Sequence, residues 1–263
     1  MRLVTWNVNS LRARLGRLEG WIGQHDPDVL LLQETKCADA DFPAAAFTQL
    51  GYESAHHGDG RWNGVAIVSR VGLAGVRAGF GEELAGEPGE CRILSAECGG
   101  VRVFSVYVPN GRAVDSEHYV AKLEWLAQLR RELDATCDPA GAVAVGGDFN
   151  VAPEDRDVWD IGAFEGATHV TAPERDALRR VMDFGLVDVV RRLHPDEVGP
   201  FSWWDYRGGA FHKGEGMRID LLLASAPVVA RVGAAFVDRE ARKGQGSDQQ
   251  PSDHAPVVVD LAP

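Results

Sequence analysis

The sequence predicts an α/β fold in which two mixed β-sheets pack together and helices cover their outer faces. Three observations support this: strand-like apolar runs outnumber helix-like ones, the Cys98-Gly99-Gly100 segment joins two neighbouring runs like an antiparallel hairpin, and no change of pattern divides the chain. Because hairpins are expected, two mixed sheets are favoured over a single parallel sheet. We therefore expect residues 1–263 to form one domain.

The predicted strands are short apolar runs spread along the whole chain. Turn residues or polar residues bound them, as expected of buried strands. In chain order they are 2–6, 28–33, 64–69, 91–97, 101–108, 142–145, 218–223 and 255–261.

Three segments have the spacing of amphipathic helices. In 11–22 the apolar residues recur at helical intervals, and Ser10 precedes them as a candidate N-cap. Segments 115–134 and 174–184 show the same periodicity. These helices are expected to lie outside the two sheets.

The composition is that of a folded protein with an acidic charge balance. Hydrophobic residues make up 45% and charged residues 25% of the chain, close to average usage. The 27 Lys and Arg residues and 39 Asp and Glu residues give a formal charge of −12. A nucleic-acid partner therefore requires a locally basic face, and cations at any acidic cluster that meets a phosphate.

The four cysteines and the absence of a targeting segment indicate a cytoplasmic protein. No C-x-x-C pair is present, which argues against a zinc ribbon, a redox motif or a disulfide framework. Neither a signal peptide nor a membrane span is recognisable, so no membrane partner is expected.

Two polar motifs beside predicted strands are candidates for the chemistry. Asp148 and Asn150 follow an apolar strand and stand two residues apart, so both could face one pocket. Asp253 and His254 lie in the loop before the last strand. Each motif alone is better explained by local turn bonding or a solvated charge pair.

Other polar residues also stand at or beside strand segments, namely Asn7, Glu34, Tyr107 and Asp220. Independent turn explanations do not predict this coincidence. Polar groups gathered around one sheet edge would form an acidic pocket rich in oxygen ligands. Such a pocket suits Mg²⁺ or Mn²⁺ rather than zinc.

Roles in phosphoester cleavage follow from these residue types. Asp148 could orient and deprotonate the attacking water, with Asn150 holding that water or Asp148 in place. His254 is expected to bond a phosphate oxygen or the developing oxyanion instead of the metal, with Asp220 holding its tautomer. Tyr107 could donate to a phosphate oxygen or act as a proton donor, and the sequence does not separate these roles.

Seven segments in order carry a resemblance to a known family: 6–13 (WNVNSLRA), 32–36 (LQETK), 107–111 (YVPNG), 147–150 (GDFN), 202–207 (SWWDYR), 218–220 (RID) and 252–256 (SDHAP). Nearly end to end, the chain resembles bacterial exonuclease III-type AP endonucleases of the endonuclease/exonuclease/phosphatase superfamily. The G-D-x-N and S-D-H motifs occur throughout that superfamily. The Q-E-T-K, S-W-x-D-Y-R and R-I-D-x-L-L patterns are narrower and favour the DNA-repair branch.

The resemblance implies a four-layer α/β sandwich and a Mg²⁺-dependent enzyme for which Mn²⁺ substitutes. Its expected partner is double-stranded DNA, incised 5′ to abasic sites or trimmed at 3′ ends to leave a 3′-hydroxyl, and the protein is expected to be a monomer. It implies metal positions at Asn7, Glu34 and Asp253, catalytic groups at Tyr107, Asp148, Asn150, Asp220 and His254, and substrate contacts at Asn110, Arg112, Trp203, Trp204, Met217 and Ile219.

The substrate-binding surface is less well defined by the sequence. Trp203 and Trp204 could both be core aromatics. By family likeness, one of them could instead line the pocket for a flipped-out sugar. Met217 stands where some relatives carry a larger aromatic, which leaves the pocket shape open. Seven basic residues near the motifs form either a phosphate-binding face or ordinary solvated charges: Lys36, Arg61, Arg92, Arg112, Arg207, Lys213 and Arg218.

Two other functions remain open at this point. A phosphoesterase of the same fold could act on phosphoinositides, sphingomyelin or undamaged DNA. A nucleic-acid-binding regulator could retain the scaffold without activity, although the intact set of acidic residues and His254 argues against it.

Overall fold

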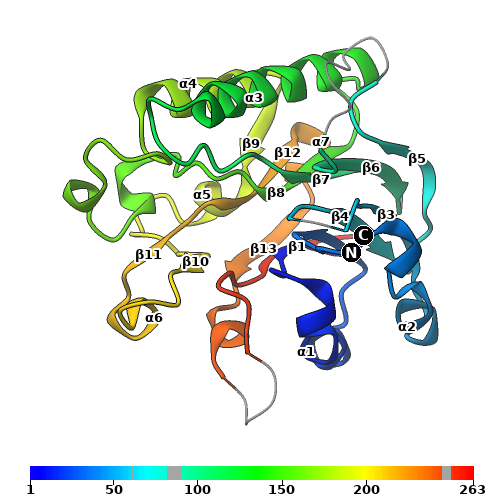
Figure 1. The fold of residues 1–263 in the computed structure, drawn as a ribbon. Coiled ribbons are helices and arrows are strands. Elements are labelled where there is room, and N and C mark those ends of the chain that lie inside the picture. The colour runs from blue at the N-terminus through cyan, green and yellow to red at the C-terminus, as the bar shows by residue number, and fades with distance from the viewer. Residues whose placement is uncertain (61, 82–89, 245–249) are drawn as a thin grey trace.

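A computed structural model describes residues 1–60, 62–81, 90–244 and 250–263. Within these ranges the chain builds two six-stranded sheets that face each other, with helices on the outer side of each (Figure 1). This arrangement is the predicted α/β sandwich of four layers.

The first sheet has the strand order β13-β14-β1-β2-β4-β3. Its central strands β1 and β2 run parallel, and the other neighbours are antiparallel. The sheet is therefore mixed, as predicted. Its strands are β1 Arg2–Asn7, β2 Val29–Gln33, β3 Glu53–His57, β4 Val65–Ser69, β13 Val232–Val237 and β14 Val257–Leu261.

The second sheet has the order β5-β6-β7-β8-β12-β9, and within it β7 and β8 are parallel. The predicted hairpin is confirmed: β6 and β7 pair from Ile93↔Val106 to Cys98↔Val101. Gly99 and Gly100 join them with φ of 56° and 79°, the left-handed conformation that a tight hairpin turn requires. The strands are β5 Ala74–Ala78, β6 Ile93–Cys98, β7 Val101–Tyr107, β8 Val143–Asp148, β9 Leu186–Asp188 and β12 Asp220–Ser225.

Helices cover the outer faces and short elements surround one end of the sandwich. Figure 1 shows α3 and α4 along the second sheet, and α1 and α2 beside the first. The helices are α1 Leu11–His25, α2 Ala44–Gln49, α3 Glu117–Thr136, α4 Ala172–Met182, α5 Val189–Leu193, α6 Ala210–Lys213 and α7 Ala226–Val229. The short elements are the strands β10 Trp203–Trp204 and β11 Gly216–Met217, and the 3-10 turns η1 Asp39–Asp41, η2 Asp155–Asp157, η3 Ile161–Phe164 and η4 Arg239–Arg242.

The core between the sheets is built from side chains of both. Leu3 and Leu31 of the first sheet belong to the same buried cluster as Val103 and Leu222 of the second. At Gly146 a Cβ atom would stand 2.7 Å from Leu31 Cδ1, so glycine at this position lets β8 approach the first sheet closely. This approach lies two residues before Asp148.

Some local expectations were wrong. Strands β3, β5, β9 and β13 were not predicted, because they are short or largely lack buried apolar residues; β5 is exposed along its length. Ser10 stands at the N-cap position of α1 but does not cap the helix: its φ is 86°, and its side chain accepts no capping hydrogen bond.

None of the helices within the described ranges is long and apolar enough to cross a bilayer.

Candidate active site

The candidate site lies where the central strands of both sheets end. Asn7 is the last residue of β1, Glu34 follows β2, and Asp148 ends β8. Because β12 runs antiparallel to β8, its first residue, Asp220, pairs with Asp148. The fold thus brings together polar groups that are far apart in the sequence.

Asn7 bridges the two carboxylates at the centre of the site. Its buried Nδ2 donates to Glu34 Oε1 at 2.8 Å and to Asp148 Oδ2 at 3.0 Å. Burial raises the pKa of Asp148 to about 7; the charges of Asp220 and Glu34 act in the same direction, while His254 opposes them. Two carboxylates held this close repel each other, so the site favours a cation between them.

His254 stands on the other side of Asp148 and is fixed by Asp220. His254 Nδ1 lies 2.8 Å from Asp220 Oδ2, and Ser202 Oγ donates to the same oxygen at 2.7 Å. Burial alone would lower the pKa of His254, but the charges of Asp220, Asp148 and Asp253 raise it to about 10. The imidazolium therefore directs Nε2 toward Asp148 Oδ2, 3.8 Å away.

Asp253 lies beside this cluster and is held by neutral donors. Asn9 Nδ2 donates to its Oδ1 at 2.8 Å, and Trp203 Nε1 donates to its Oδ2 at 3.1 Å. Burial would raise the pKa of Asp253, but His254 and these two donors lower it. Both carboxylate oxygens of this predicted metal ligand are thus engaged by side chains of the protein.

In the described part of the chain, Glu34, Asp148 and His254 lie close enough together for a metal ion to bind among them. One ligand atom from each lies within 4.8 Å of the others. With the Asn7 amide beside them, the donors are mainly oxygens, which fits a hard divalent cation. His254 was expected to bind substrate and not the metal. Its Nδ1 is engaged by Asp220 and its pKa is raised to about 10, which fits that expectation because an imidazolium cannot bind a cation.

Asn150 is held in place by a buried network that the sequence did not predict. Its backbone has a φ of 50°, its Nδ2 donates to Val108 O at 2.9 Å, and its backbone N–H donates to Asp148 Oδ1. Lys122 Nζ donates to Asn150 O at 2.6 Å and forms an ion pair with Glu174. Both charged side chains of this pair are fully buried.

The signal for this network was present in the sequence but ambiguous. Lys122 lies among the apolar positions of helix α3, where a lysine is usually a surface residue. Glu174 is the N3 residue of the capping box of α4, which explained it without reference to the site. Only the packing of the two helices shows that these charges meet.

Tyr107, at the end of β7, borders the acidic cluster. Burial raises the pKa of its phenol well above the usual value, and the charges of Glu34 and Asp148 raise it further. The guanidinium of Arg92 stacks over the ring at 4.5 Å from its centroid. Tyr107 is therefore a neutral hydrogen-bond donor next to the candidate metal position.

A hollow of about 600 Å³ adjoins the cluster. The predicted substrate residues Arg112, Trp203 and Met217 line it. So does His169, which the sequence did not single out: its Nδ1 lies 2.6 Å from Asn150 O, and burial lowers its pKa to about 4. In the sequence His169 is a single histidine in a predicted loop, and nothing near it indicates a role in the site.

The other predicted substrate residues lie around this hollow. Asn110 Nδ2 donates to Asn150 Oδ1 at 3.1 Å, which ties its exposed loop to the site. Ile219 is buried and packs with Met217 behind the hollow. Trp204 points into the core, with Phe211 edge-on to it at 5.2 Å, so of the two tryptophans it is Trp203 that lines the hollow.

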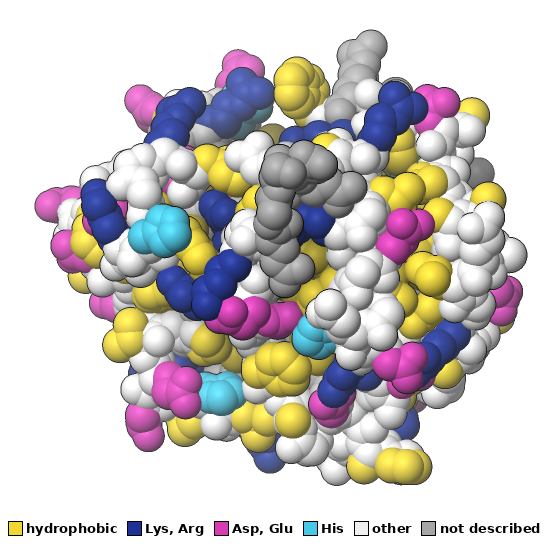
Figure 2. All heavy atoms as spheres, turned by 90° about the horizontal axis from the view of Figure 1, so that it is seen from below, with side chains coloured by type: hydrophobic (Ala, Val, Ile, Leu, Met, Phe, Trp, Pro, Cys, Tyr) yellow, Lys and Arg dark blue, Asp and Glu magenta, His cyan; other side chains and the backbone are white. Residues whose placement is uncertain are grey.

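The predicted basic face is partly wrong. Arg218, two residues before β12, is fully buried. Its guanidinium is bonded to Asp157 in η2 and to Asp188 at the end of β9, so it does not reach solvent. Arg207 borders the hollow, and Lys36 Nζ lies 2.8 Å from Glu34 Oε2. Lys213 is exposed, and Arg61 lies outside the described residues. Figure 2 shows a face on which basic side chains are interspersed with acidic and neutral ones.

Comparison with protein families gives one match that spans most of the chain. Residues 4–254 match the Endonuclease/Exonuclease/phosphatase family. The chain is 35% identical to exodeoxyribonuclease III of Haemophilus influenzae over 276 aligned residues, covering 99% of this chain and 100% of the relative. It is 30% identical to an exodeoxyribonuclease of Bacillus subtilis, with 98% of each chain covered.

Solved structures give the same relationship. An AP endonuclease from Archaeoglobus fulgidus superposes with a TM-score of 0.93 and 36% identity, with 99% of each chain covered. The 3′-5′ exonuclease NExo from Neisseria meningitidis superposes with a TM-score of 0.94 and 36% identity over the whole of both chains. A related NExo structure, described as a 3′ phosphatase, holds a product DNA hairpin.

Proposed function

The chain belongs to the endonuclease/exonuclease/phosphatase family, and we infer that it is a metal-dependent phosphodiesterase of DNA repair. In this role it incises duplex DNA 5′ to abasic sites and processes 3′ ends, leaving a 3′-hydroxyl. The names and activities of the relatives support this assignment, which agrees with the DNA-repair branch expected from the motifs.

One observation in the site carries the chemistry: Asn7 holds the carboxylates of Glu34 and Asp148 together opposite a charged His254. Such a group can bind a divalent cation and a phosphate at the same place. We propose Mg²⁺ as the ion, with Mn²⁺ as a substitute, because the donors are mainly oxygens. Glu34 would hold it, with the Asn7 amide beside it.

Bound there, the cation would neutralise phosphate charge and stabilise the leaving 3′ oxygen. The side chains of the chain supply the remaining functions. Asp148, oriented by Asn7 and by the Asn150 N–H, is placed to orient the attacking water and accept its proton. His254 has its Nδ1 engaged by Asp220, which leaves Nε2–H free to donate to a phosphate oxygen. Tyr107 can donate to the same phosphate.

The hollow beside the cluster is the proposed site for the nucleotide next to the cut. Trp203 and Met217 provide apolar walls, and Arg112 stands at its rim. Extrusion of a nucleotide from the duplex costs least where the base is missing, which favours abasic deoxyribose.

We further propose that residues 1–263 form one catalytic domain that acts as a monomer in the cytoplasm. Both sheets contribute to one buried cluster, and every proposed catalytic group comes from the same chain. The cysteines Cys37, Cys91, Cys98 and Cys137 are free, which suits a reducing compartment.

The decisive experiment uses three labelled duplexes: one with an internal abasic site, one intact, and one with a 3′-phosphate. With Mg²⁺ we expect incision of the abasic duplex and processing of the 3′ ends, and with EDTA we expect neither. If the protein with Mg²⁺ or Mn²⁺ leaves all three duplexes unchanged, the proposed function is wrong.

A further inference from the structure

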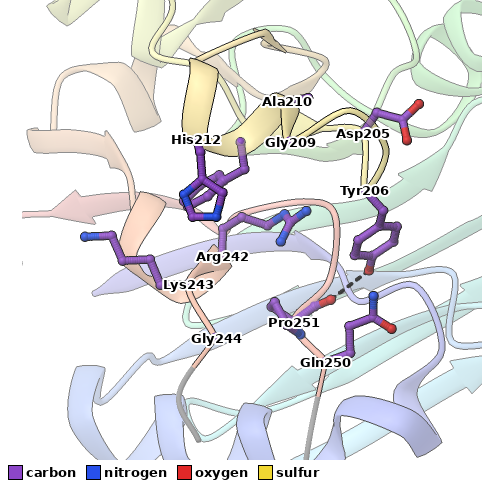
Figure 3. Close-up of a pocket in the computed structure, with 11 residues that line it drawn as sticks. Asp205, Tyr206, Gly209, Ala210, His212, Arg242, Lys243, Gly244, Gln250 and Pro251 are labelled. Carbon is purple, nitrogen blue, oxygen red and sulfur yellow. Dashed lines mark hydrogen bonds between the residues drawn. The ribbon is translucent and has the colours of Figure 1, made fainter. Parts of the chain in front are cut away.

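A second cavity, of about 440 Å³, lies close to the candidate active site but outside the acidic cluster. Figure 3 shows it between the turn that carries Asp205 and Tyr206, the end of η4 at Arg242 and the segment at Pro251. The catalytic scheme above makes no use of these side chains. Their arrangement therefore needs a separate explanation.

Arg242 is the unusual residue of this cavity. Its side chain is only 7% exposed, and its Nε has no hydrogen-bond partner. The guanidinium carbon lies close to two aromatic rings, 4.9 Å from the centroid of Tyr206 and 5.2 Å from that of Phe211. Within the described ranges no carboxylate forms an ion pair with it.

Among the described residues, Arg218 shows the carboxylate partners that a buried arginine normally has and that Arg242 lacks. Arg218 is also buried, but Asp157 and Asp188 neutralise it through short hydrogen bonds. A largely buried guanidinium without an ion-pair partner among the described residues is unfavourable, so Arg242 is a candidate for an external anion. Burial lowers the pKa of Arg242. The charges of Tyr206 and Asp253 oppose this effect, and the nearby charges of Arg14 and Arg17 add to it.

The cavity is otherwise suited to an anion. Lys243 and His212 also line it, and Asp205 is the acidic residue among its described lining side chains. The Asp205 Oδ1 atom already accepts a hydrogen bond from the Arg207 backbone N–H at 2.8 Å. Arginine forks bind phosphate oxygens through paired hydrogen bonds, and an arginine can also stack on aromatic rings.

Direct contacts connect this cavity to the active site. Tyr206 Oη donates to Pro251 O at 2.7 Å, immediately before the Ser252-Asp253-His254 motif. Arg14 donates to Tyr206 Oη at 3.0 Å and also to Asn9 O, while the Asn9 side chain bonds Asp253. Asp205 and Ala210 line both this cavity and the hollow that contains Trp203.

We propose that the Arg242 cavity binds a backbone phosphate of the DNA other than the one that is cut. The assignment rests on the proposed function, because only a substrate with a repeating phosphate backbone occupies both places at once. It adds a contact that positions the duplex relative to the acidic cluster.

The salt dependence of DNA binding tests the contact. Full-length protein and Arg242→Met are titrated with an abasic-analogue duplex in EDTA over a series of salt concentrations. Each phosphate contact contributes about 0.9 to the slope of log K against log salt. The slope of Arg242→Met should therefore be less steep by about 0.9, and Arg242→Lys should retain most of the wild-type slope.

Arg239→Met is the matched control. Arg239 stacks on the same Phe211 ring at 4.1 Å, but it is exposed and donates to Phe211 O. Replacing Arg239 removes one positive charge near the cavity, as Arg242→Met does, but leaves the lining of the cavity intact. Equal slopes for wild type and Arg242→Met, or an equal change in both methionine variants, would overturn the assignment.

A scan of the DNA gives a second test, which does not depend on the stability of Arg242→Met. Single phosphates of the duplex are replaced by neutral methylphosphonates. Wild type should lose affinity at one position outside the cut phosphate, and Arg242→Lys should lose less there. A scan without such a position contradicts the proposal.

Inorganic phosphate distinguishes a free anion from the DNA backbone. If ³¹P line broadening shows Arg242-dependent binding of inorganic phosphate while the DNA slopes stay equal, the ligand is a free anion and the proposal is wrong. Cleavage by wild type is measured in parallel. Normal cleavage with equal slopes rejects the Arg242 contact alone, whereas no cleavage rejects the proposed function.

Discussion

At the scale of single residues, the site depends on hydrogen bonds that hold like charges together. Asn7 and the Asn150 N–H bind Asp148 from two directions, and Asp220 orients His254. The sequence indicated these residues because they stand at strand ends. It gave only an ambiguous signal for Lys122 and none for His169 or Arg242, because the surroundings of these residues come from distant segments.

Asp148→Asn should reduce the rate of abasic-site incision by about 10² or more, because an amide cannot accept the proton of the attacking water. The side chain keeps its shape, so DNA binding should largely remain. Single-turnover cleavage and a binding titration measure the two effects. Asp134→Asn, at an exposed position of α3, is the control and should cleave normally. Near wild-type cleavage by Asp148→Asn would show that Asp148 does not accept the proton of the attacking water.

At the scale of elements, the central strands were predictable and the edges were not. β2, β4 and β8 are buried on both faces and appear in the sequence as continuous apolar runs. β3 and β5 lie at the edges of their sheets, where exposed residues remove that pattern. Arg218 was misplaced for a related reason: polar residues beside a strand do not reveal which of them turns inward.

Replacing glycine with alanine should have opposite effects on stability in two elements. At Gly147, in β8, a Cβ would overlap the carbonyl oxygen of Val106 on the neighbouring strand, whereas at Gly20, in α1, it would meet no atom within 4 Å. Gly20→Ala should stabilise the protein by about 0.5–1 kcal/mol, since alanine is the better helix former.

Gly147→Ala should destabilise it by several times that amount, because backbone must move. Urea unfolding of both variants gives the comparison. A neutral Gly147→Ala would mean that β7 and β8 can separate at the site without loss.

At the scale of the whole molecule, the charge of −12 and the DNA substrate are compatible because the acidity is locally compensated. The carboxylates of the site face a cation position, and the arginines near it lie in hollows instead of forming one broad basic surface. The charge total alone could not show this arrangement, since it carries no information on position.

Metal binding should therefore stabilise the folded protein. Adding Mg²⁺ should raise the Tm, because the ion binds the assembled site and not the unfolded chain; saturation at about 100 times the Kd corresponds to about 2.7 kcal/mol. NaCl at equal ionic strength is the salt control. Glu34→Gln should lose most of the Mg²⁺-dependent rise, and an equal rise in that variant would place the ion elsewhere.

The position of β14 has a consequence for how the enzyme is made. This strand inserts between β13 and β1, and the loop just before it carries His254. During translation, Asn7 and Glu34 leave the ribosome long before the histidine that completes their cluster. A chain that ends before His254 therefore lacks both the histidine itself and β14, the strand of the first sheet that follows it, so its site is not assembled.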